Sequence, residues 1–372
     1  MTGEDLRAKF PTIDSLVAYA QEQLAPEVWD YVSGGAGSET TLRRNRLGYE
    51  RIGFRPTLMH DVRGLDTSCD LFGQSLALPV MLAPVGSIGR YHAGGPIAVA
   101  EVAEKFQALT FVGSVAEPGI TEVRERVKSP LGYQLYVRGD RDWIADRVRV
   151  AEEAECSVLC VTADGAASGR RERNLVNDYS PAQDLANRYQ AFFTWADFAW
   201  LRSVTDLPLM VKGIMSADDA RRAEDAGANG VYVSNHGGRQ LDHLPGTIEV
   251  LPEVVEAVSD GTTVLIDGGV IHGADVVKAL ALGAHGVGIG KLMVWSLAAG
   301  GQSGLERALE ILRDEILNVM ALLGVTSLEE LNPRYVRDIT LVPPSEWIGF
   351  RPGSTETGPT VSATPSPVTS SS

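Results

Sequence analysis

The stretch 231–242, VYVSNHGGRQLD, places a base, two glycines and a cation in succession. Histidine is the side-chain type whose ordinary pKa lies closest to neutrality, which suits His236 for accepting and releasing a proton at physiological pH. Arg239 follows three residues later, and its planar guanidinium suits a carboxylate. Gly237 and Gly238 permit positive φ and leave room for a flat ligand against the backbone. A histidine alone would fit a protein core, whereas this combination predicts a proton-transfer site beside an anion-binding side chain.

Such a site needs a scaffold that brings distant segments together. From residue 79 onward, apolar runs alternate with amphipathic segments typical of helices, which include 95–107, 140–155, 216–226 and 274–282. Continuous apolar strands that alternate with helices indicate parallel strands buried on both faces. The eight runs lie at 79–86, 109–114, 131–137, 157–164, 208–214, 230–238, 263–269 and 286–291.

Eight such units predict an α/β protein, a single (β/α)₈ TIM barrel. A doubly wound sheet is the alternative, but neither GxGxxG nor GxxxxGK[ST] follows the first strand. Residues 1–50 form a predicted N-terminal helical cap, and residues 51–351 the barrel with C-terminal helices. The connection 165–194 has the length of an active-site lid. Residues 352–372 have almost no apolar side chains, so we expect a disordered tail.

Composition excludes several kinds of partner. The 372 residues carry 33 Lys and Arg against 48 Asp and Glu, a net charge of −15, which repels nucleic acid. No apolar run approaches the roughly 20 residues that span a bilayer, and no secretory signal is visible, so we expect a cytoplasmic protein without a membrane partner. The three cysteines lack zinc-type spacing, and we predict neither a disulfide nor a metal site.

Polar side chains stand at the ends of most predicted strands. In a barrel these carboxyl ends converge on one mouth, so groups over 150 residues apart can meet there. A polar residue at a single strand end could merely terminate it, but the repetition favours one common site. The side chains concerned are Gln134, Tyr136, Thr162, Asp164, Lys212, Ser234, His236, Asp267 and Lys291.

Strands seven and eight end in DGG (267–269) and GIGK (288–291), and each opens a helix. Glycines let backbone N–H groups approach an anion, and a helix N-terminus favours negative charge. Barrels often bind phosphate after these two strands. We therefore predict that a phosphorylated ligand binds here.

These motifs resemble those of the FMN-dependent 2-hydroxy-acid oxidoreductases, a family that includes glycolate oxidase, lactate oxidase, lactate 2-monooxygenase and mandelate dehydrogenase. The resemblance runs from about Tyr19 to Leu331. SNHGGRQLD is its most specific motif, and APVG, QLYV, VTAD, GRRERN, VKGI, DGG and GADVVKALALGA follow the family's order.

The resemblance implies FMN as cofactor and residues 51–351 as the FMN-binding barrel. It implies His236 as catalytic base, Asp164 as its carboxylate partner, Tyr136 near the substrate hydroxyl and Lys212 near flavin N1. It implies that Arg239, Arg171 and Tyr31 hold the substrate carboxylate. The implied flavin and ribityl contacts are Pro84, Val85, Gly86, Gly113, Ser114, Gln134, Thr162 and Ser234, and the ribityl and phosphate contacts are Asp267, Gly268, Gly269, Val270, Ile271, Gly290 and Lys291. A homotetramer is implied as well.

The sequence departs from this family at several positions. Ile271 stands where many members carry an arginine, so we expect one cation fewer near the phosphate and weaker FMN binding. Gly113 removes a hydroxyl near the flavin. Val115 and Ser168 replace larger residues, which indicates a substrate bulkier than glycolate. Gly86 stands where many oxidases carry an alanine, so both reaction and non-reaction of the reduced flavin with oxygen stay open.

The expected activity is FMN-dependent oxidation of an (S)-2-hydroxy acid to a 2-oxo acid, with the flavin reoxidised by O₂ or a quinone-type acceptor. The same half-reaction as a dehydrogenase or monooxygenase, a non-redox FMN barrel enzyme and a binding protein with a relict site are the alternatives. The sequence does not select the substrate, or hydride over carbanion transfer.

Overall fold

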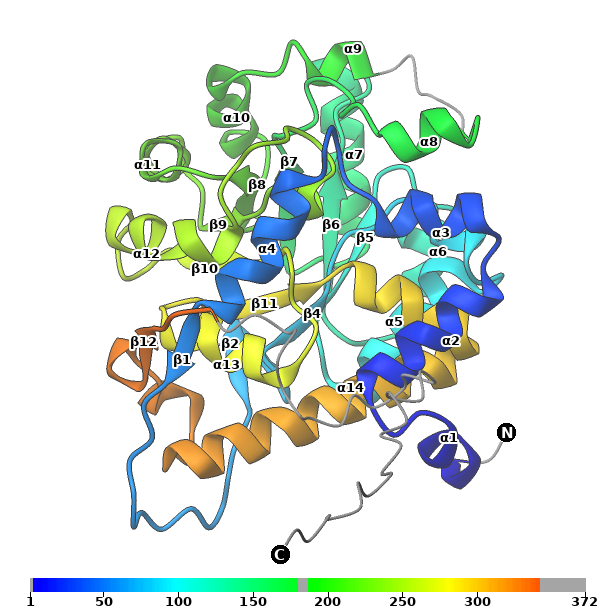
Figure 1. Cartoon of the computed structure of the whole chain (residues 1–372). Helices are drawn as coiled ribbons and strands as arrows, with labels where there is room; N and C mark the ends of the chain where they lie inside the picture. Colours follow the sequence, from blue (N-terminus) through cyan, green and yellow to red (C-terminus); the bar gives the residue numbers. More distant parts are fainter. Residues whose placement is uncertain (1–2, 180–186, 342–372) are drawn as a thin grey trace, which may run out of the picture.

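The structure is a computed structural model that describes residues 3–179 and 187–341. Its centre is a closed barrel of eight parallel strands in chain order (Figure 1). Every strand lies inside one of the eight predicted apolar runs, so the predicted (β/α)₈ barrel is confirmed. The strands are β4 (Val80–Leu82), β5 (Thr110–Gly113), β6 (Leu131–Leu135), β7 (Val158–Thr162), β8 (Leu209–Ile214), β9 (Gly230–Val233), β10 (Thr263–Ile266) and β11 (Gly286–Ile289).

Helices follow the strands and surround the barrel. The N-cap side chains of Asp140 and Ser216 accept backbone N–H groups where α7 and α11 begin. The longest helix, α14, changes direction at Gly300 and Gly301, which leave helical geometry. The helices are α5 (Gly95–Phe106), α6 (Ile120–Arg124), α7 (Arg141–Glu153), α10 (Trp195–Arg202), α11 (Ala217–Asp225), α12 (Thr247–Ala257), α13 (Gly273–Ala281) and α14 (Lys291–Leu323).

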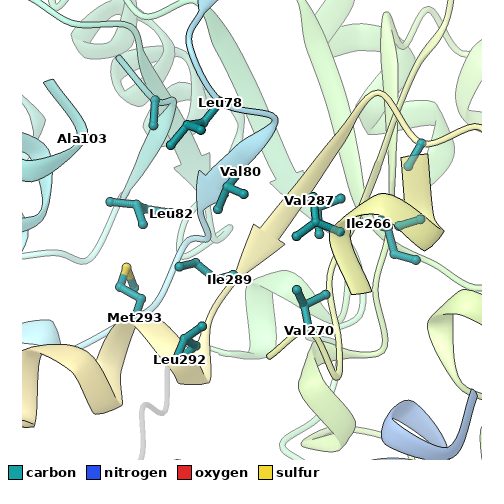
Figure 2. Close-up of a cluster of buried hydrophobic side chains, with 14 of the residues drawn as sticks. Leu78, Val80, Leu82, Ala103, Ile266, Val270, Val287, Ile289, Leu292 and Met293 are labelled. Carbon is teal, nitrogen blue, oxygen red and sulfur yellow. The ribbon is translucent and has the colours of Figure 1, made fainter. Parts of the chain in front are cut away.

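Two layers of apolar side chains hold the barrel. The outer layer lies between strands and helices, and Figure 2 shows part of it, where Leu82 of β4 and Ile289 of β11 approach Met293 of α14. The inner layer fills the barrel itself, with Phe111 and Tyr232 as its largest strand side chains. Successive side chains along each strand point alternately to the outer and the inner layer. The interior of the barrel is therefore a packed core rather than a channel.

A hairpin that we did not predict contributes to the inner layer. Strands β2 (Cys69–Leu71) and β3 (Gln74–Leu76) pair antiparallel, and Leu71 and Leu76 are buried within the inner cluster. The hairpin contacts the first residues of two strands, Gly230 of β9 and Gly286 of β11. It therefore covers the amino end of the barrel and leaves ligands the carboxyl end.

The predicted helical segment 1–50 contains four helices, α1 (Gly3–Lys9), α2 (Ile13–Gln23), α3 (Pro26–Ser33) and α4 (Thr40–Glu50). Helix α2 buries Ile13, Leu16 and Ala20 and packs on α14. Beyond α4, strand β1 (Ile52–Phe54) pairs with β12 (Val336–Asp338). The domain boundaries stay a prediction, and the predicted tail 352–372 lies outside the described residues.

The connection 165–194 contains two short helices, α8 (Glu172–Val176) and α9 (Asn187–Gln190), and its residues 180–186 lie outside the described ones. Within the described ranges, no helix combines the length and apolarity that crossing a bilayer requires. All three cysteines are free. Burial raises the pKa of Cys160 to about 12, as expected of an inert core thiol.

We predict that Gly132→Ala destabilises the barrel by about 1–3 kcal/mol, because a methyl group there would collide with the ring of Phe111 in the inner layer. Gly261→Ala is the matched control, since its methyl group would meet nothing within 4 Å. Urea denaturation of both variants measures the difference. Equal stabilities would show that the inner layer is not tightly packed at this point.

Candidate active site

A cavity of about 360 Å³ opens at the carboxyl ends of the strands, within the size range of small-molecule sites. Every predicted catalytic side chain lines it except Asp164, which lies behind His236. The predicted site residues along its wall are Tyr31, Pro84, Val85, Gly86, Tyr136, Arg171, Lys212, His236, Arg239, Asp267, Gly268, Gly269, Val270, Ile271, Gly290 and Lys291.

His236 stands where β9 turns sharply. His236, Gly237 and Gly238 all have positive φ, so the two glycines serve the turn as expected. His236 Nδ1 lies 3.1 Å from Asp164 Oδ1, and its Nε2 lies 3.4 Å from the Tyr136 hydroxyl. The carboxylate therefore fixes one ring nitrogen and leaves the other to face the cavity, the arrangement that a general base requires.

The Asp164 carboxylate is held as an anion. Burial raises its pKa, but the neighbouring His236 and then Lys212 more than offset this and keep the pKa below its usual value. Gly213, at a bulge in β8, gives the carboxylate space, because a side chain there would lie 2.9 Å from Asp164 Cβ. An ionised Asp164 stabilises a proton on His236.

Lys212 belongs to a second buried network. Its ammonium lies 2.5 Å from Ser234 Oγ and 3.1 Å from Asp267 Oδ2, and Ser234 donates to Asp267 Oδ1 over 2.6 Å. Burial lowers the pKa of Lys212, but Asp267 and Asp164 raise it above the usual value. Lys212 thus presents a fixed positive charge to the cavity.

Two guanidiniums face the cavity without a carboxylate partner among the described residues. Arg239 is bound by backbone carbonyls of Tyr31, Val32 and Gly34, and Arg171 Nε is buried without a hydrogen bond to any described residue. The Tyr31 ring contacts both, with its centroid 4.8 Å from Arg239 Cζ and 5.6 Å from Arg171 Cζ. Burial and then Arg171 lower the pKa of Arg239 to about 10. An anion between the two cations would relieve this repulsion.

Contacts between the N-terminal segment and α8 fix the positions of Tyr31 and Arg171 relative to each other. Arg173 of α8 donates to Asp30 Oδ1 over 3.0 Å and to Glu39 Oε2 over 2.6 Å, and Asn177 donates to Asp30 Oδ2 over 2.8 Å. We call these four residues the α8 latch. Asp30 precedes Tyr31 on α3, and Arg173 lies two residues after Arg171, so the latch joins two of the three segments that surround the cationic group.

The glycine turns leave space and donors for a phosphorylated ligand. Added methyl groups would meet nothing within 4 Å at Gly86, and at Gly290 only Val85 at 3.9 Å. Gly268 and Gly269 have positive φ, and their amides and that of Val270 donate to no described residue. An open wall and unpartnered amides fit a flat ring with a phosphate tail.

Lys291, the predicted phosphate cation, lines the cavity, but its ammonium donates to the carbonyls of Ser33 (2.8 Å) and Gly34 (3.1 Å). Burial and then Arg239 lower its pKa well below the usual value. The ammonium thus binds the C-terminal end of α3. Its predicted phosphate contact stays a prediction.

Five of the predicted flavin residues support the wall instead of lining it. Gln134 donates to Thr162 Oγ1 over 2.7 Å, and the Ser114 hydroxyl accepts the Tyr136 amide over 3.1 Å. A methyl group at Gly113 would lie 3.1 Å from Gln134 Oε1, so glycine lets the amide side chain pack there. Ser234 joins Lys212 to Asp267 as described. These roles beside a flavin stay predictions.

Several residues of the wall were not predicted from the sequence. Arg138 directly follows a predicted strand, so its position could have been predicted in the same way as that of Tyr136. Tyr91 lies after a short 3₁₀ turn, η1 (Ile88–Arg90), and Arg46 on a helix outside the barrel, and neither has a local motif. The others include Leu42, Ser87, Val294 and Trp295. Within the described residues, no group of three His, Cys, Asp or Glu could hold a metal ion.

Comparisons with known proteins agree with this geometry. The family described as FMN-dependent dehydrogenase matches residues 20–338. The chain is 37% identical to the glycolate oxidase of Spinacia oleracea over 349 residues, 87% of this chain and 95% of the relative. A crystal structure of mandelate oxidase with (S)-2-phenylpropionate superposes with a TM-score of 0.83 at 37% identity and covers 90% of this chain and 100% of that one. A soluble mutant of the membrane-associated (S)-mandelate dehydrogenase from Pseudomonas putida gives 0.83 at 32% identity, with coverage of 88% and 99%.

The barrel and its cavity therefore define a flavin-dependent oxidoreductase. The chain belongs to the FMN-dependent dehydrogenase family, and the resemblance to the FMN-dependent 2-hydroxy-acid oxidoreductases is confirmed. Its cofactor is FMN.

We predict that Arg173→Ala loosens the segment 169–177. Partly exposed ion pairs contribute up to about 1 kcal/mol each, so loss of the latch should speed amide exchange there about fivefold. Hydrogen exchange followed by mass spectrometry measures this. Arg170→Ala is the control, because Arg170 is largely exposed and lies 3.8 Å from its nearest carboxylate, Glu172. Equal exchange in the two variants would contradict a latch.

Proposed function

We propose that this enzyme oxidises (S)-2-hydroxy acids larger than glycolate to 2-oxo acids, with His236 as the base. The observation that carries the proposal is one cavity that joins an Asp-supported imidazole to two guanidiniums free of carboxylate partners among the described residues. A 2-hydroxy acid has the matching pair of groups, a carboxylate and, on the adjacent carbon, a hydroxyl. FMN, when bound, supplies the acceptor for the two electrons.

The substrate carboxylate binds Arg171 and Arg239, with Tyr31 between them. A bidentate guanidinium contact fixes the direction of a carboxylate, and a second restricts its rotation. The hydroxyl on the next carbon then reaches Nε2 of His236 and the hydroxyl of Tyr136, which lie 3.4 Å apart. Burial raises the pKa of Tyr136 well above its ordinary value, so this hydroxyl stays protonated and can donate.

His236 Nε2 takes the proton of the substrate hydroxyl. Asp164, across the ring, stabilises the resulting imidazolium, as a carboxylate does in other histidine-based sites. Lys212 offers its positive charge to the electron-rich reduced cofactor. Pro84, Val85 and Gly86 would hold one face of the flavin, and the turn 267–271 with Gly290 the ribityl phosphate.

The substrate side of the cavity favours a bulky acid. Val115 lines the wall there together with Tyr91 and Gly86, whereas Ser168, the other small residue in our expectation, is not part of the wall. Related structures are of mandelate oxidase and mandelate dehydrogenase, whereas the curated relative from spinach is a glycolate oxidase. We propose an acid of about the size of mandelate.

The electron acceptor is O₂ or a quinone-type carrier. Gly86 leaves open space at the wall, since a methyl group there would meet nothing within 4 Å. This space is available to oxygen or to a retained product, and it supports no choice between an oxidase, a dehydrogenase and a monooxygenase. The homotetramer and the cytoplasmic address stay predictions, the first drawn from the family and the second from the sequence.

We predict that His236→Ala retains FMN but reduces it at least about 100-fold more slowly with substrate, the lower bound for loss of a general base. Stopped-flow bleaching of the flavin under anaerobic conditions, with mandelate, lactate, glycolate and longer 2-hydroxy acids, measures the rate. His243→Ala serves as the control, since His243 is an exposed histidine seven positions further along. A rate equal to that of the control would remove His236 from the mechanism, and failure of every acid to bleach the parent enzyme would refute the proposed activity.

We also predict that Val115→Trp reverses the substrate preference. An indole would fill the space beside Val115, so kcat/KM for mandelate should fall at least about tenfold relative to glycolate, corresponding to about 1.4 kcal/mol. Val115→Ala is the matched variant that keeps the space open. If Val115→Trp and Val115→Ala show the same ratio of the two kcat/KM values, Val115 does not set the size limit.

A further inference from the structure

In the glycine turn 267–271, the amides of Gly268, Gly269 and Val270 donate to no described residue, yet the segment itself supplies no cation. Ile271 is apolar and packs partly against the core. Lys291, on the neighbouring turn, donates to the carbonyls of Ser33 and Gly34. A phosphate monoester carries a charge of about −1.5 to −2 at pH 7, so amides alone would leave much of it uncompensated.

Arg46 of α4 provides a positive charge at this turn. Its Nη1 donates to the carbonyl oxygen of Gly269 over 2.5 Å and to Asp275 Oδ2 over 2.7 Å. Its side chain is one-third exposed and lines the same cavity as Gly268, Gly269 and Ile271. Nε and Nη2 form no hydrogen bond to any described residue, so the guanidinium is anchored by one nitrogen and has donors left over.

The preceding residue fixes α4 against the turn. Asn45 is buried and exchanges two amide hydrogen bonds with Asn235, over 2.9 and 2.7 Å, and its Oδ1 accepts the Thr247 amide over 3.2 Å. A methyl group on Gly269 would collide with the carbonyl oxygen of Asn45. The backbone of α4 therefore contacts the turn, and the side chain of Arg46 extends from this point to the cavity wall.

The carboxylate of Asp275 does not cancel this charge at the turn. Its Oδ2 accepts the amides of Ile271 and His272, each over 3.0 Å, in addition to Arg46 Nη1. Asp275 is buried at the third residue of α13, where a carboxylate satisfies the first amides of a helix. It therefore serves the start of α13 and holds Arg46 in place, while the free edge of the guanidinium remains available.

We infer that Arg46 is a ligand of the FMN phosphate in this chain and supplies the positive charge that Ile271 does not. Ile271 led us to expect weaker FMN binding. Arg46, which lies on a helix more than 200 positions from Ile271 in the sequence, offsets this loss. The same charge has no partner on a flavin without phosphate. Arg46 should thus discriminate FMN from riboflavin.

The experiment titrates the apoprotein with FMN and with riboflavin, followed by flavin fluorescence. Arg46→Ala should weaken FMN binding about 10- to 100-fold, the value of a charge-assisted hydrogen bond, and leave riboflavin affinity within about twofold of the parent. Arg43→Ala, which removes an exposed arginine from the same helix, should change neither. In the Arg46→Ala background, Ile271→Arg should restore at least half of the lost FMN affinity on a logarithmic scale.

Two outcomes would overturn the assignment. Equal losses for FMN and riboflavin would show that Arg46 only holds α4 and α13 together. Unchanged FMN affinity would show that the phosphate lies elsewhere. Arg46→Lys guards against a folding defect, because a lysine keeps the charge beside Asp275, and it should lose less FMN affinity than Arg46→Ala. FMN binding is measured without substrate, so these results do not depend on the proposed reaction.

Discussion

The structure depends on holding two guanidiniums together in a buried cavity without a carboxylate partner among the described residues. Arg239 bonds three backbone carbonyls between Tyr31 and Gly34, where α3 ends and its dipole is negative. Carbonyls hold the charge without neutralising it, so the pair keeps its attraction for an anion. A carboxylate side chain in their place would have stabilised the empty site and competed with the ligand. The cationic pair therefore requires α3, and the N-terminal segment becomes part of the site.

The basic side chains in and around the cavity differ in whether a carboxylate binds them. Asp267 and Ser234 fix Lys212, and Asp164 fixes His236. Glu39 accepts Arg173 and the Gly35 amide at the rim, and although burial raises its pKa, these contacts keep it below the usual value. Arg171 and Arg239 receive no carboxylate from the described part of the chain, and Lys291 is held by the carbonyls of Ser33 and Gly34. One region of the cavity thus offers unpaired positive charge, which we propose binds the substrate carboxylate, and another places Tyr136 beside His236, the proposed base.

Periodicity alone predicted the barrel, because a strand buried on both faces must be apolar throughout and its helices must alternate. The residues at strand ends, among them Asp164, Lys212 and His236, could be predicted because the fold dictates where such ends meet. Tyr91 and Arg46 could not, since each enters the wall from an element whose position depends on tertiary packing. The hairpin β2–β3 was missed for a similar reason. Its strands have three residues each, too few for a pattern, and they are fixed by the inner core that they cover.

The N-terminal helices connect the two functions of the cavity. Helix α3 brings Tyr31 to the cationic pair, and α4 brings Arg46 to the glycine turn, with Leu42 of α4 packed against Gly238. A side chain on Gly238 would lie 2.8 Å from the Leu42 backbone, so glycine at this position lets α4 pack directly against the turn that positions His236. The docking of one peripheral segment therefore sets the geometry of the base, the carboxylate site and the glycine turn together. A displacement of α3 and α4 from the barrel would for this reason affect cofactor and substrate binding in parallel, although neither helix belongs to the barrel.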